Sequence, residues 1–83
     1  MLMTGKNWEY LYKIFMPDEW DKIKDSCCPT PKTVISEFNR GRTVDSIAND
    51  VKASKVYKTK REAADYVRRC IYFAQQQDRG RAG

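Results

Sequence analysis

The amino-acid sequence predicts an all-α protein, a small bundle of about five helices in a single domain over residues 1–83. Apolar residues recur at the i, i+3, i+4, i+7 spacing of helices that bury one face. Thr, Pro and Gly stand where such helices would begin and end. The sequence has no run of alternating apolar and polar residues and no Asn-Gly or Asp-Gly turn, so β-strands have little support.

Residues 1–28 are expected to form a pair of helices. The first runs from about residue 7 to residue 15 and ends before Pro17, which also suits the first turn of a second helix over about residues 18–25. Asp18 and Glu19 are favourable at the positive end of the second helix dipole. The apolar positions of the pair are Trp8, Leu11, Tyr12, Phe15, Trp20 and Ile23.

Residues 30–77 are expected to form three more helices, followed by a frayed tail over residues 78–83. Thr30 and Thr43 are suitable N-caps, and Gly41 suits the left-handed residue that ends a helix. Thr59 and Glu62 form a T-x-x-E capping box at the start of the last helix. The predicted core positions of these helices are Val34, Ile35, Phe38, Val44, Ile47, Ala48, Val51, Ala63, Val67, Cys70, Ile71 and Ala74.

The charge is placed unevenly along the chain. Residues 1–39 carry five Lys and six acidic residues, a net charge of −1, whereas residues 40–83 carry eleven Lys and Arg and five acidic residues, a net charge of +6. The sum is the net charge of +5 of the whole chain. Such a C-terminal half is typical of a protein that meets a polyanion, either nucleic acid, an acidic protein or an anionic membrane surface.

Several classes of protein are disfavoured by the composition. The chain has no His and only three Cys, two of them adjacent, so we expect no metal site, no cofactor and no disulfide framework. Motifs for phosphate cradles, nucleophile elbows and zinc proteases are absent, so we expect no enzyme activity and no catalytic residues. No apolar run approaches the about 20 residues that span a bilayer, and there is no signal peptide, so we expect a cytoplasmic protein without membrane contact.

The last three helices have the arrangement of a trihelical helix-turn-helix unit, in which the amino end of the last helix enters the major groove of DNA. Segment TPKTVISEFNRGRTVDSIANDV resembles the start of the LuxR-type (GerE-like) DNA-binding domain, and KTKREAADYV is similar to its recognition helix. The resemblance covers about residues 30–72, with a longer connector, KASKVYK, before the last helix. It implies a helix-turn-helix fold and a regulator that binds double-stranded DNA. Its matching positions are Thr30, Pro31, Val34, Ile35, Phe38, Gly41, Ile47, Ala48, Val51, Thr59, Ala63 and Val67.

The first function hypothesis is therefore a small transcriptional regulator of helix-turn-helix type, encoded by a phage or mobile element on one interpretation of its small size and basicity. Contacts with base edges are expected from Lys58, Lys60, Arg61 and Asp65. Contacts with phosphates are expected from Arg40, Arg42, Lys52, Lys55, Arg68 and Arg69. A homodimer is expected because two half-sites multiply the modest affinity of one short recognition helix.

The second hypothesis is a small non-enzymatic adaptor or inhibitor that grips an acidic surface of a host protein with the same basic helix. Two structural alternatives are also left open by the sequence. Val56 and Tyr57 in the connector either pack back onto the core or leave the connector free to follow a nucleic-acid backbone. Tyr66 and Tyr72 fall off the apolar stripe of the last helix and are expected to mark an exposed patch for a second subunit.

Overall fold

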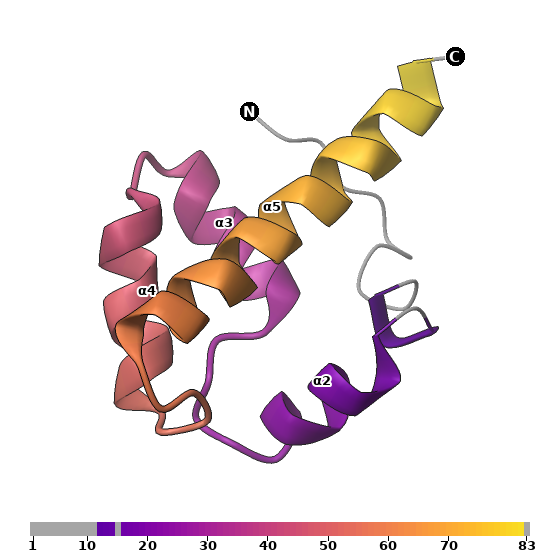
Figure 1. Cartoon of the computed structure of the whole chain (residues 1–83). Helices are drawn as coiled ribbons and strands as arrows, with labels where there is room; N and C mark the ends of the chain where they lie inside the picture. Colours follow the sequence, from indigo (N-terminus) through magenta and orange to yellow (C-terminus); the bar gives the residue numbers. More distant parts are fainter. Residues whose placement is uncertain (1–11, 15, 83) are drawn as a thin grey trace.

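The computed structural model describes residues 12–14 and 16–82, with side chains described as far as Gln76. It contains the helices α2 (Pro17–Ile23), α3 (Pro31–Asn39), α4 (Val44–Ala53) and α5 (Lys60–Ala82), which are drawn in Figure 1. Residues 12–14 are also helical. The other residues of the helix expected over 7–15, which are 7–11 and 15, lie outside the described residues. Every regular element within the described ranges is helical, which confirms the all-α fold.

The helix starts follow the capping residues of the sequence. Thr30, Thr43 and Thr59 each accept a hydrogen bond from the backbone N–H three residues further on, at 3.3, 3.1 and 3.1 Å. The carboxylate of Glu62 reaches back to the backbone N–H of Lys58 at 3.2 Å, one residue before the N-cap that a standard capping box would satisfy. These bonds fix where α3, α4 and α5 begin.

Two residues with positive φ end α3 and α4. Gly41 has a φ of 100°, as expected for the left-handed residue after a helix, and its N–H donates to the carbonyl of Phe38 at 3.0 Å. Lys55 has a φ of 67° after α4, and its N–H donates to the carbonyl of Lys52 at 3.0 Å. A lysine pays a steric penalty in this conformation that glycine does not, because its Cβ crowds the backbone.

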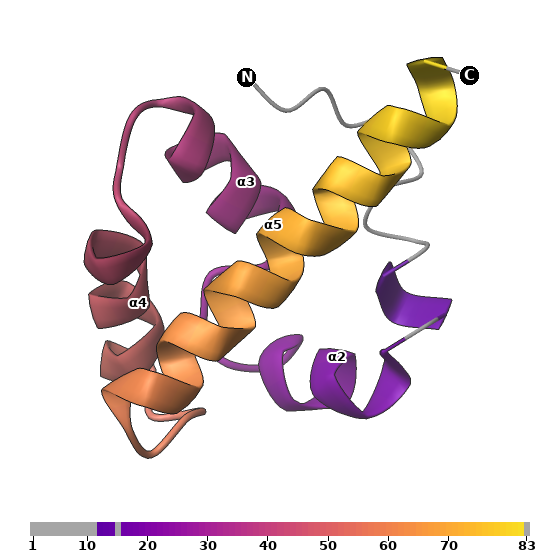
Figure 2. The ribbon, with the colours of Figure 1, turned by 45° about the horizontal axis from the view of Figure 1, so that its top comes forward.

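Helix α5 crosses both α3 and α4 and is the longest element of the fold, as the two views in Figures 1 and 2 agree. Its most extensive contact is with α4, whose buried side chains are Ile47, Ala48 and Val51. Helix α5 continues to Ala82, whereas residues 78–83 were expected to form a frayed tail. The buried side chains of this three-helix unit are Pro31, Val34, Ile35, Ile47, Ala48, Val51, Ala63, Tyr66, Val67, Cys70 and Ala74.

The N-terminal part of the described chain lies on the other side of α5 from α4 (Figure 2). Tyr12 and Ile23 are buried there, and the ring of Tyr12 meets that of Phe73 edge to face at 5.7 Å between centroids. The ammonium of Lys13 stands 4.9 Å from the centre of the Trp20 ring, a cation–π contact. Helix α2 is therefore joined to the bundle by side chains rather than by close backbone packing.

The expectation for Tyr66 is wrong, whereas Tyr72 is exposed as expected. Tyr66 is fully buried: its hydroxyl donates to the carbonyl of Pro29 at 2.8 Å, and its ring stacks on Tyr57 at 5.3 Å between centroids. Tyr66 lies beside the apolar stripe of α5 and faces the segment before α3, and this segment covers its side chain. Tyr57 and Val56 pack against the core, which decides between the two alternatives for the connector.

The strained φ of Lys55 yields a stability prediction. We expect Lys55→Gly to raise the free energy of unfolding by about 0.5 kcal/mol, because the relief of left-handed strain exceeds the added entropy of the unfolded chain. Urea unfolding followed by circular dichroism measures this change. Lys52→Gly is the matched control, since Lys52 lies within α4 and a glycine there should lower stability by about 1 kcal/mol. A loss of stability in both variants would contradict the argument.

The buried tyrosines yield a prediction for alkaline pH. Burial, assisted by nearby negative groups, raises the pKa values of Tyr12, Tyr57 and Tyr66 above the ordinary value of 10.0. Above that pH the unfolded chain loses these protons and the folded chain keeps them, so stability should fall as the pH rises past about 10. Urea midpoints measured at increasing pH test this, and Tyr66→Phe should make the fall shallower. An equally steep fall in that variant would exclude a role for Tyr66.

Candidate functional site

The structure divides the predicted binding residues into those held within the fold and those that remain available. Arg42 belongs to the first group. Its guanidinium lies 2.8 Å from a carboxylate oxygen of Asp50 and 3.8 Å from one of Glu37, and it donates to the hydroxyl of Ser46 at 2.9 Å. The hydrogen bond with Asp50 raises the pKa of Arg42. Arg42 thereby joins the end of α3 to α4.

Arg69 also belongs to the first group. Its guanidinium lies 2.8 Å from Oε1 of Glu19, whose side chain is only 12% exposed, and the hydroxyl of Tyr57 donates to the same oxygen at 2.9 Å. Burial acts to lower the pKa of Arg69, but the Glu19 carboxylate outweighs it and leaves the pKa raised. Burial and then the same carboxylate raise the pKa of Tyr57. Glu19 thus fastens α2 to both α5 and the connector.

Four further predicted residues, Arg40, Lys60, Asp65 and Arg68, form ion pairs at the surface. The ammonium of Lys60 lies 2.7 Å from Asp45, and this pair links the first turns of α5 and α4. Arg68 and Asp65 pair at 3.3 Å along α5, and Arg40 stands 4.0 Å from Glu37. These side chains are largely exposed, except for that of Glu37, so each pair contributes little stability and opens readily to a competing anion.

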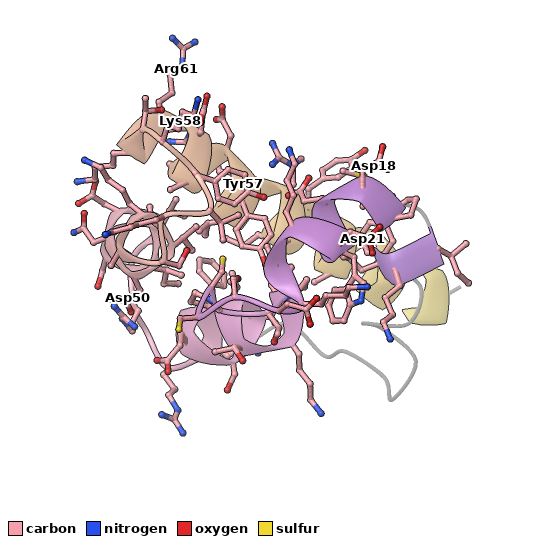
Figure 3. The ribbon with its side chains drawn as sticks, turned by 90° about the horizontal axis from the view of Figure 1, so that it is seen from below. Asp18, Asp21, Asp50, Tyr57, Lys58 and Arg61 are labelled. Carbon is pink, nitrogen blue, oxygen red and sulfur yellow. The ribbon has the colours of Figure 1, made fainter. Side chains whose placement is uncertain are left out.

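The remaining four residues, Lys52, Lys55, Lys58 and Arg61, are exposed and form no side-chain ion pair with any residue that the structure describes. They come from the last turn of α4, the connector and the first turn of α5, and we call them the basic end. Figure 3 shows Arg61 projecting away from the body with Lys58 beside it, whereas Asp18 and Asp21 lie on the opposite side. Four exposed cations without an ion pair thus come together at this end of the described structure, whereas Lys22 on α2 is such a cation elsewhere.

Two residues that are important for this geometry could not be identified from the sequence. Glu19 was explained by the dipole of its own helix, and its partners are far along the chain, so no local pattern connects them. Tyr57 was left between two alternatives. Its aromatic side chain inside a lysine-rich connector was the only signal that the connector returns to the core. Together they hold the backbone immediately before Lys58.

A hollow of about 370 Å³ lies beside the basic end, between α2, the connector and α5. Lys22, Lys58 and Arg69 contribute positive charge to its walls, and Glu62 and Asp65 contribute negative charge. The mixture of signs does not favour a single anion there. Contacts by Lys58 are more readily made toward the open side, where Arg61 projects.

The cysteines show no sign of reactive chemistry. Burial raises the pKa values of the Cys28 and Cys70 thiols, and it leaves them as packed, protonated groups. Cys27 is exposed and all three are free thiols. Among the side chains that the structure describes, no three acidic or cysteine side chains converge in a way that would hold a metal ion.

No family model, no curated protein and no solved structure matches this chain. Among the helices that the structure describes, none combines the length and the apolar character needed to cross a membrane.

The division between held and available cations predicts different effects on stability. We expect Arg69→Gln to lower the free energy of unfolding by about 1 kcal/mol, because the largely buried Glu19 loses a charged donor. Arg61→Gln, a matched change on the same helix, should alter it by less than about 0.5 kcal/mol. Urea unfolding of both variants measures the difference. Equal losses would show that Arg61 is also engaged in the fold.

Proposed function

We propose that this protein binds double-stranded DNA through the basic end, with Lys52, Lys55, Lys58 and Arg61 placed on phosphates. The observation that carries the proposal is that these four exposed cations form no ion pair with the described residues and come from one short stretch of chain. Binding a phosphate then requires no internal pair to be broken. Release of the counterions held by the duplex supplies the driving force.

The position of the basic end supports duplex DNA in particular. It surrounds the amino end of α5, which in a helix-turn-helix unit is the end that enters the major groove. Arg61 projects from the first turn, where its planar guanidinium suits a bidentate contact with a phosphate beside the groove. Lys60 is adjacent but paired with Asp45, and it joins the contact when that exposed pair opens.

The roles of the other predicted residues follow from their contacts. Arg42 and Arg69 hold α3, α4, α5 and α2 in place, and we do not include them among the DNA contacts. Arg40 is exposed enough to add a phosphate contact at the edge of the surface, whereas Arg68 is paired with Asp65 and is not included. The proposed interface is therefore narrower than the set of basic residues in the sequence.

Salt dependence of binding is the direct test. Fluorescence anisotropy with a labelled duplex of mixed sequence should give a log–log slope of about −3.6 against salt concentration, that is, four phosphates at about −0.9 each. Lys58→Gln combined with Arg61→Gln should reduce the magnitude of the slope by about 1.8, two phosphates at about −0.9 each, and weaken binding at low salt. Lys24→Gln combined with Lys32→Gln removes the same charge from the residue after α2 and from α3, and is the matched control.

An unchanged affinity in the Lys58 and Arg61 variant, with the control equally unchanged, would contradict the proposal. Binding of an acidic polypeptide such as polyglutamate, with no retention of duplex at the same salt concentration, would instead favour an adaptor that grips an acidic protein surface. Single-stranded DNA and RNA in the same titration show whether the duplex is preferred.

A further inference from the structure

We propose that this protein forms a two-fold symmetric homodimer in which Tyr72 of each copy enters a groove of the other. The groove lies between α5 and the N-terminal residues Tyr12 and Met16. Its volume is about 490 Å³, and the apolar side chains that line it include Phe73. Tyr72 belongs to the same surface and is 64% exposed, the most exposed large hydrophobic residue within the described ranges.

The groove and Tyr72 together meet the requirement of a two-fold interface, which must be complementary to itself. A projecting aromatic ring and an apolar hollow lie side by side on one surface. Rotation by 180° therefore places the ring of each copy over the hollow of the other. Each contact is made twice, which helps a small surface to reach the burial that a stable dimer needs, about 800 Å² from each chain.

The charges beside the groove are also complementary to themselves. Arg68 and Asp65 line it and pair at 3.3 Å within one chain, with side chains 65% and 48% exposed. In the dimer Arg68 meets the partner's Asp65, and the reverse contact forms at the same time. The surface thus presents one positive and one negative group from this pair, so two chains of net charge +5 can approach here without strong repulsion.

The dimer surface shares no residue with the basic end. Lys52, Lys55, Lys58 and Arg61 are absent from the groove, so each copy keeps its own cations available in the dimer. The inference goes beyond the proposed function and does not rest on it, because self-association can be measured with no DNA present.

Sedimentation velocity on the full chain over a range of concentrations tests the proposal. The wild-type protein should shift from the mass of one chain to that of two as the concentration rises. Tyr72→Glu should raise the dimer dissociation constant by about 30-fold or more, the effect expected when an interfacial aromatic anchor is lost. Ser36→Glu adds the same charge to an exposed site on α3 and should leave the dissociation constant unchanged.

A mixing experiment separates contact between chains from contact within one chain. Asp65→Arg places two positive groups at the interface and Arg68→Asp places two negative groups, so each variant alone should dimerise weakly. An equimolar mixture should recover association as a heterodimer, because opposite charges then face each other. Both variants lose the pair within the helix, so a structural effect of that loss would persist in the mixture.

Thermal unfolding by circular dichroism verifies that each variant is folded before it is compared. A wild-type protein that remains a single chain at submillimolar concentration overturns the proposal. A Tyr72→Glu variant that dimerises as well as the wild type also overturns it. Loss of dimerisation with duplex binding retained would separate this inference from the proposed function.

Discussion

The packing of α5 against α4 is the contact on which the other features of this protein depend. Helix α5 makes its most extensive helix contact with α4 and packs against α3 as well. The core face of α5 is thereby fixed against α4 and α3. Its opposite face then lies toward solvent. The helical repeat places four residues on that face, namely Arg61, Asp65, Arg68 and Tyr72. Both proposed surfaces are consequences of this single orientation.

Electrostatics in this chain serves two different purposes. Carboxylates on α2, α3 and α4 hold Arg69, Arg42 and Lys60, and the resulting pairs connect one helix to another. Four of the described cations that lack such partners, Lys52, Lys55, Lys58 and Arg61, gather where α4 passes into α5. A positive residue in the C-terminal half is therefore no guide to binding until its nearest carboxylate is known.

Much of the fold could be predicted from local sequence, because caps and helical periodicity act over a few residues. Thr30, Thr43, Thr59 and Gly41 all occupy the positions that their chemistry favours. The error at Tyr66 arose because its partner, Pro29, lies far away in sequence. For the same reason the candidate site could be predicted only as a set of charges. Which of them are free depends on tertiary contacts such as that between Arg69 and Glu19.

The connector between α4 and α5 has a consequence for the thermodynamics of any anion that docks on it. Tyr57 anchors it to Glu19, and the N–H of Lys58 is bonded to Glu62, so the backbone that carries Lys55 and Lys58 is already ordered before an encounter. A flexible lysine-rich loop would lose about 1–2 kcal/mol of backbone entropy for each residue that became fixed. Here the loss is confined to side-chain torsions, which favours preorganised recognition over coupled folding and binding.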